Sequence, residues 1–166
     1  KVRHFGVSNQ NPMMMELLKT AIKQPLKVNQ LQLSAAFTPS FEAGFHVNME
    51  GPKAAVRDGS VFEYCRLTDT VIQAWSVLQH GYFKGNFVGK EEFAALNHVL
   101  TDLAKKYQVT PTAIALAWVL RYPGKTQAVI GTTKPQHVLE AGKAAEITLT
   151  RKEWYQIYLA AGNDLP

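Results

Sequence analysis

The chain contains one cysteine and no long apolar run. Cys65 has no second cysteine to pair with, which is typical of a reducing compartment. No segment approaches the roughly 18 apolar residues of a membrane span, and the first thirty residues lack the charged head and apolar centre of a secretory signal. We therefore expect a cytoplasmic protein with no membrane partner.

Runs of like charge are also missing, although the net charge is +5. The lysines are scattered, as in Lys19, Lys23 and Lys27, and no run exceeds two residues, which is the pattern of solvated helix faces. We expect no nucleic-acid partner. A modest positive field is better suited to a phosphorylated small molecule.

Two common kinds of site motif are absent. No G-x-G-x-x-G turn follows any expected strand, and no phosphate-binding G-x-x-x-x-G-K-[ST] loop exists. The five histidines show no H-x-x-x-H or H-E-x-x-H spacing and have no cysteine pair beside them, so we expect no metal site.

Strand-like and helix-like segments alternate along the chain. Strands are expected at residues 1–7, 28–33, 70–75 and 126–130, and the third has little alternation, as in a strand covered on both faces. Helices are expected after the Asn11-Pro12 and Thr110-Pro111 caps, over 93–107, after Pro135 and after the capping box Thr150-x-x-Glu153. This order predicts an α/β fold with parallel strands and right-handed crossovers.

A doubly wound sheet and a (β/α)8 barrel both satisfy this order. Polar or aromatic groups lie at or near every expected strand end, where a barrel places its site, as in Ser8-Asn9, Asn29-Gln30, Trp75-Ser76 and Gly131-Thr132-Thr133. The chain opens inside a strand without an initiator methionine, and four units are half of a barrel. We therefore expect residues 1–166 to form one domain, the carboxyl half of a (β/α)8 TIM barrel, made of four βα units and a C-terminal helix. Such a half leaves two open edges and an apolar face that its missing half covers.

Four segments in this order carry a family resemblance: 6–9 (GVSN), 28–32 (VNQLQ), 73–76 (QAWS) and 129–135 (VIGTTKP). Together they closely resemble the second half of the aldo-keto reductases, most of all the bacterial oxidoreductases. The resemblance implies an NAD(P)H-dependent oxidoreductase that reduces aldehydes or ketones, small carbonyl compounds, to alcohols.

The resemblance assigns the nicotinamide ring to the ends of the first three strands. Ser8, Asn9 and Gln30 match residues that bind its carboxamide, and Trp75 matches an aromatic side chain stacked on the ring. The same cofactor stretch continues through Ser76, Val77 and Leu78. The alternatives are core packing for Trp75, and helix capping or a polar layer inside the barrel for Ser8, Asn9 and Gln30.

The end of the fourth strand is matched to the cofactor's 2′-phosphate. Gly131, Thr132, Thr133 and Lys134 lead into a helix whose N-terminus favours an anion. His137 stands where many relatives have an arginine, which weakens the contact with that phosphate. Glu140 matches a position near the adenine amine. NADP is therefore the expected cofactor, and NAD is less favoured.

Two long connections complete the expected site. Residues 34–69 form a long connection that offers walls for a substrate, and within it we expect a helical turn or two over 53–66. Residues 79–87 match a loop over the pyrophosphate in which Lys84 meets phosphate. The proposed walls are Phe37, Phe41, Phe45 and His46. The alternative is that both connections only cover the barrel rim.

No catalytic residue is predicted. The family's acid is a tyrosine, supported by lysine, aspartate and histidine from the first half of the barrel, and no tyrosine in this chain stands at a strand end beside a matching lysine. Two hypotheses follow: one half of a reductase that needs its amino-terminal half-barrel or a second copy, or a non-catalytic half-barrel that binds nucleotide or a protein partner.

Overall fold

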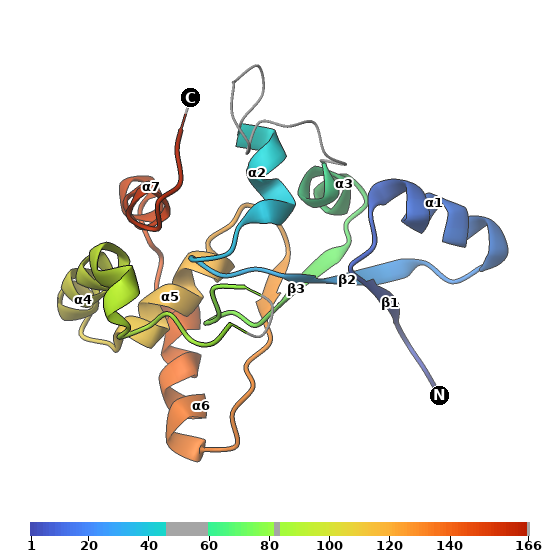
Figure 1. Cartoon of the computed structure of the whole chain (residues 1–166). Helices are drawn as coiled ribbons and strands as arrows, with labels where there is room; N and C mark the ends of the chain where they lie inside the picture. The colour runs from blue at the N-terminus through green and yellow to red at the C-terminus, as the bar shows by residue number, and fades with distance from the viewer. Residues whose placement is uncertain (46–59, 82–83, 166) are drawn as a thin grey trace.

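Four parallel strands form one sheet in the order β1-β2-β3-β4 (Figure 1). The computed structural model describes residues 1–45, 60–81 and 84–165. The strands are β1 (Phe5–Ser8), β2 (Leu26–Gln32), β3 (Val71–Trp75) and β4 (Thr126–Ala128). The predicted α/β fold with four parallel strands and flanking helices is confirmed.

Seven α-helices flank the strands in the described parts of the chain: α1 (Pro12–Ala21), α2 (Pro39–Phe45), α3 (Val61–Leu67), α4 (Ala94–Tyr107), α5 (Pro111–Leu120), α6 (Pro135–Gly142) and α7 (Arg151–Ala160). Short 3-10 helices lie at Glu91–Phe93 and Lys143–Glu146. None of the helices in these parts is long and apolar enough to cross a membrane.

The three predicted helix starts are confirmed by their capping bonds. Asn11 Oδ1 accepts the Met14 N–H at 2.8 Å, and Thr110 Oγ1 accepts the Ala113 N–H at 3.2 Å. Thr150 and Glu153 form the complete capping box of α7. Each cap satisfies N–H groups that a helix leaves open at its first turn.

Strand lengths differ from the sequence expectation at both edges of the sheet. β1 begins at Phe5 rather than at residue 1, because its only neighbour, β2, begins at Leu26, the partner of Phe5. β4 ends at Ala128 rather than at residue 130, because its pairing with β3 stops there. Two helices, α2 and α3, lie in the described parts of the long 34–69 connection, and residues 46–59 of it fall outside the described residues.

The two faces of the sheet differ sharply. Leu31, Ile72 and Ala74 are buried and belong to the helix-covered core. On the other face, register aligns Ser8 with Gln30, Gln73 and Gln127. The expectation that the third strand is covered on both faces is wrong, because β3 alternates between buried and partly exposed residues. The open face is also not simply apolar, because this polar row crosses it.

The close approach of β1 to β2 explains why residue 6, in the matched segment 6–9, is a glycine. A Cβ at this position would meet the Val28 Cβ at 2.7 Å, closer than side-chain atoms approach one another. The close pairing of β1 with β2 therefore requires glycine at residue 6.

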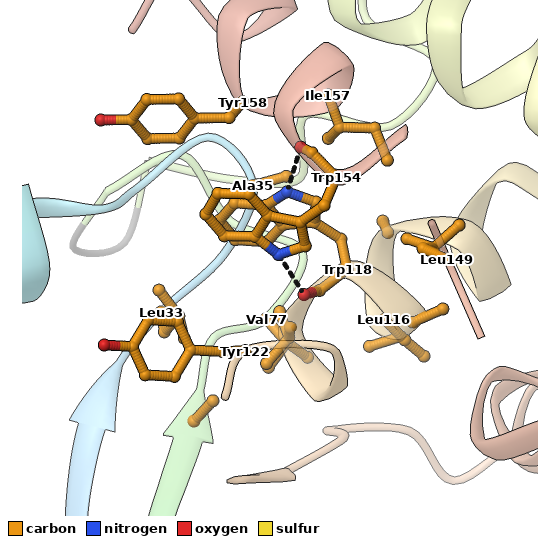
Figure 2. Close-up of a cluster of buried hydrophobic side chains, with 14 of the residues drawn as sticks. Leu33, Ala35, Val77, Leu116, Trp118, Tyr122, Leu149, Trp154, Ile157 and Tyr158 are labelled. Atoms are coloured by element: carbon orange, nitrogen blue, oxygen red, sulfur yellow. Dashed lines mark hydrogen bonds between the residues drawn. The ribbon is translucent and has the colours of Figure 1, made fainter. Parts of the chain in front are cut away.

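The core is anchored by a pair of tryptophans on α5 and α7. The rings of Trp118 and Trp154 stack with centroids 4.8 Å apart (Figure 2). Each indole N–H donates to the other residue's carbonyl, at 3.0 and 3.1 Å. Residues 113–119 of α5 are all buried, as predicted for a buried helix. The two bonds satisfy buried polar groups while the rings fill the space between the helices.

Glu153 ties α7 to α4. Its carboxylate accepts the Lys106 ammonium at 2.5 Å, the Tyr107 hydroxyl at 2.9 Å, and the Thr150 N–H and hydroxyl at 2.7 and 2.8 Å. Burial raises the pKa of Glu153, but the hydrogen bonds from Lys106, Thr150 and Tyr107 outweigh burial and lower the pKa from 4.5 to about 2. The charged form is thus favoured by folding.

We predict that Glu153→Gln lowers the free energy of unfolding at pH 7 by about 1–3 kcal/mol, because charge-assisted hydrogen bonds are lost. A lowered pKa in the folded state stabilises the protein above pH 4.5, and this stabilisation is lost as the pH falls toward 2. The difference between wild type and variant should therefore shrink below pH 4.5, as measured by urea unfolding. The exposed Glu146→Gln is the control, and a pH-independent difference would contradict the assignment.

Candidate functional site

A cavity of about 510 Å³ opens at the carboxyl ends of β3 and β4. Eight of the thirteen predicted site residues line it: Trp75, Ser76, Val77, Leu78, Gly131, Thr132, His137 and Glu140. The sequence reasoning did not assign Thr112, Leu116 and Ala141, which also line this cavity. A buried apolar helix such as α5 gives no sequence signal that its first turn faces a site.

Trp75 and Ser76 form the wall at the end of β3. Trp75 is partly exposed and lines the cavity, so it is not simply a core residue. Ser76 follows it with a φ of 52°, in the left-handed region that residues other than glycine rarely adopt. Such backbone strain is concentrated at functional sites. The chain here turns sharply enough for residues 75–78 all to reach one cavity.

The opposite wall is the turn between β4 and α6. Thr132 Oγ1 accepts the Lys134 N–H at 3.2 Å and lies 3.4 Å from Nδ1 of His137. Glu140 accepts a hydrogen bond from Gln136 at 3.1 Å. Thr133 and Lys134 are exposed and are not among the residues that line the cavity. The turn is therefore held mainly by Thr132, which joins its start to the first turn of α6.

Ser8, Asn9 and Gln30 are brought together where the end of β1 pairs with β2. The Ser8 hydroxyl and the Asn9 N–H both donate to the Gln30 carbonyl oxygen, at 3.2 and 2.9 Å. Asn9 has a φ of 53°, a conformation that asparagine tolerates better than most residues. These three residues are not among those that line the 510 Å³ cavity.

Asn29 holds the Ser8–Gln10 segment in place. It is fully buried; its side-chain amide donates to the Gln10 carbonyl at 2.8 Å, and its Oδ1 accepts the Gln10 N–H at 3.4 Å. A third contact runs from its amide to the Met15 sulfur at 3.5 Å. Because both ends of the amide bind one residue, Asn29 positions the backbone that carries Ser8 and Asn9. The sequence pattern identified Asn29 only as a polar residue near the end of a strand.

Gln30 also belongs to the polar row of the open face. Its amide donates to Gln73 Oε1 at 3.4 Å, and the Gln73 amide donates to Gln127 Oε1 at 3.1 Å. This row has the composition that the sequence alternative of a polar layer inside the barrel describes. The Gln30 amide occupies the same row as Ser8, which keeps both groups at one level of the sheet.

The two long connections contribute differently from expectation. Phe41 is buried and stacks on Tyr122 at 5.5 Å, with Phe62 edge-on at 5.4 Å, so it is a core residue rather than a substrate wall. His46 lies outside the described residues, as do Tyr82 and Phe83. In the second connection Gln79 and Asn86 pair as an isolated bridge and line the cavity, whereas the exposed Lys84 does not.

The described residues include two tyrosine–lysine–glutamate groups, both on helices. Tyr64 of α3 bonds to Lys19 and Glu16 of α1, and Tyr107 of α4 bonds to Glu153 beside Lys106. Burial, followed by the Glu153 carboxylate, raises the pKa of Tyr107, which makes it a poorer acid. Neither tyrosine lines the cavity. Within the described residues, no group of three histidine, cysteine or acidic side chains could hold a metal ion.

Comparison with known proteins agrees with this geometry. The model of the Aldo/keto reductase family matches residues 1–160. The 6-dehydroglucose reductase of Agrobacterium fabrum is 32% identical over 167 residues, which cover 99% of this chain and 49% of that protein. Oxidoreductase YdhF of Escherichia coli is 30% identical over 168 residues, which cover 100% of this chain and 50% of that protein.

Solved structures show the same fold. A crystal structure of the thermostable aldo-keto reductase Tm1743, in complex with the inhibitor epalrestat, matches 95% of this chain and 48% of its own, with a TM-score of 0.67 and 21% identity. The aldose reductase from Giardia lamblia matches 93% of this chain and 43% of its own, with a TM-score of 0.64 and 18% identity.

The four parallel strands and their helices thus define half of a (β/α)8 barrel, as predicted. The chain belongs to the aldo/keto reductase family, whose matched relatives include oxidoreductases. It spans about half the length of the curated relatives that it matches.

Proposed function

We propose that this chain, residues 1–166, is the nicotinamide- and 2′-phosphate-binding half of a cytoplasmic NAD(P)H-dependent reductase of aldehydes and ketones. The observation that carries the proposal is the cavity at the carboxyl ends of β3 and β4, which Trp75 and the 131–140 turn line together. An aromatic wall fits a planar ring, and the start of α6 fits an anion. The family relatives support the chemical class.

The residues of this chain would bind and orient a dinucleotide. Trp75 offers a ring face to the nicotinamide, and the hydroxyl and amide groups of Ser8, Asn9 and Gln30 suit its carboxamide, which has both a donor and an acceptor. When bound, the reduced nicotinamide supplies a hydride to a carbonyl carbon. Asn29 keeps Ser8 and Asn9 in register with Gln30, through its two bonds to Gln10.

A substitution at Trp75 tests whether the nicotinamide ring binds in this cavity. We predict that Trp75→Ala, in the protein at its natural length, weakens NADPH binding about 5- to 160-fold, because a stacked aromatic face is worth about 1–3 kcal/mol per ring. Isothermal titration calorimetry gives the dissociation constants, and Trp75→Phe, which keeps a ring face, is the matched control. Equal affinities for wild type and Trp75→Ala would refute the placement of nicotinamide on Trp75.

The phosphate turn sets the preference between the two cofactors. His137 is exposed and close to Thr132, so a guanidinium at residue 137 would reach the same turn. We predict that His137→Arg tightens NADP binding by about 1.5–3 kcal/mol and leaves NAD binding nearly unchanged, because only NADP has a 2′-phosphate for a charge-assisted pair. The control is Gln136→Arg, which adds the same charge at an exposed position one residue away. An equal gain in NADP and NAD affinity for His137→Arg would count against this turn as the phosphate site.

The partner of this chain is a second half-barrel, which we propose to be the amino-terminal half of the same protein or a second copy. Exposed apolar side chains gather near both edges of the sheet: Val2, Phe5, Met13 and Met14 near β1, and Val129, Ile130, Val138 and Leu139 near β4. Open strand edges and apolar patches of this kind favour association. The relatives, about twice as long, have room for such a half.

We predict that the 166-residue chain alone associates at micromolar concentration and does not oxidise NADPH with an aldehyde present. The acid is the missing part, because no tyrosine is among the described residues that line the cavity. Light scattering measures the mass, and absorbance at the NADPH band measures turnover. A stable monomer would contradict the association, and turnover would show that this chain contains its own acid. Tight NADPH binding without turnover, even at natural length, would favour the non-catalytic half-barrel.

A further inference from the structure

A second cavity, of about 300 Å³, lies at the other end of α5 from the cofactor cavity. The cofactor cavity is lined by Thr112 and Leu116 of α5, whereas this one is lined by Arg121 and Tyr122, which follow the last residue of that helix. The two cavities have no lining residue in common. The β4 edge and α6, where a second half-barrel would pack, contribute nothing to the second cavity.

Three arginines from three elements line this cavity: Arg66 of α3, Arg121 after α5 and Arg151 at the start of α7. Arg121 Nε donates to the Leu149 carbonyl at 2.8 Å, which orients its guanidinium. The Arg151 guanidinium carbon lies 5.7 Å from the centroid of the Tyr155 ring. Among the described residues, none of the three arginines forms an ion pair with an acidic side chain.

The charge around the cavity is positive. Glu63 is the one carboxylate among the lining residues, against three guanidinium groups, so the lining has a net charge of +2 (3 − 1). Arginines that are held by a carbonyl and an aromatic ring, rather than by carboxylates, keep donors available for an external anion.

The inner wall is aromatic. Tyr122 and Trp154 are each only 7% exposed, and Tyr155 packs edge-to-face on Trp154 at 5.1 Å. Figure 2 shows Tyr122 and Trp154 within a cluster of buried side chains. Burial, followed by the Glu63 carboxylate, raises the pKa of Tyr122 to about 12, and Arg66 donates a hydrogen bond to the Tyr122 side chain. The cavity thus joins aromatic surface to several donors.

We propose that this cavity is an accessory binding site for a small aromatic anion, a single ring that carries a phosphate or carboxylate group. The ring packs on the Trp154 and Tyr155 side, and the guanidinium groups of Arg66, Arg121 and Arg151 bind the anionic group. A volume of about 300 Å³ is at the lower end of the range for ligand pockets, which suits one ring and excludes a dinucleotide. This site is independent of the proposed reductase function.

The probe is phenyl phosphate, titrated by calorimetry into the protein at its natural length, with and without saturating NADPH. We expect saturable binding that NADPH does not displace and that weakens as salt is added. Benzoate tests whether a carboxylate replaces the phosphate, and benzyl alcohol, which has no charge, should bind at least tenfold more weakly than phenyl phosphate. Displacement by NADPH would place the probe in the cofactor cavity and overturn the proposal.

Variants that each remove positive charge test whether phenyl phosphate binds in this cavity. Arg66→Gln combined with Arg151→Gln should weaken phenyl phosphate binding at least tenfold, whereas Lys152→Gln, which removes a charge from the exposed neighbour of Arg151, should change it less than twofold. Circular dichroism and urea unfolding show whether each variant is folded. Equal losses for Lys152→Gln and Arg151→Gln alone, equal binding of benzyl alcohol, or no saturable binding would overturn the proposal.

Discussion

Parallel pairing of four neighbouring strands is the constraint on which the rest of this structure depends. Because every strand runs in the same direction, the carboxyl ends of all four strands lie at the same end of the sheet. Segments that are far apart in the sequence, such as 75–78 and 131–140, therefore line one cavity. The helices between the strands are the connections that this parallel order requires.

The two faces of the sheet lie in different environments. Its helix side is closed by the core around Trp118 and Trp154, where two reciprocal hydrogen bonds join α5 to α7. Its other side presents Ser8, Gln30, Gln73 and Gln127 in register, with the glutamine amides joined in a ladder. A half-barrel that covers this side needs polar groups at the level of the row, because buried amides require hydrogen-bond partners.

The candidate site combines strained and restrained backbone. Asn9 and Ser76 each have a positive φ and each directly follow the last residue of a strand. Both lie in segments that the family resemblance matches to the nicotinamide cofactor. Asn29 supports the first of them from within the core, through the backbone of Gln10. The fold thus holds the unfavourable conformation at Asn9 in place through hydrogen bonds between a buried side chain and the neighbouring residue.

The amino-acid sequence alone predicts the order of the four strands, the helices other than α2, the caps of α1, α5 and α7, and the segments at the strand ends. These features are local: a cap depends on residues three positions apart, and a buried helix shows in an unbroken apolar run. The packing of the folded chain is what puts Phe41 in the core, joins Gln30 to Gln73 and Gln127, and brings three arginines from distant segments to one cavity. Those outcomes depend on which elements pack together across 30 or more residues, and side-chain type alone does not encode that packing.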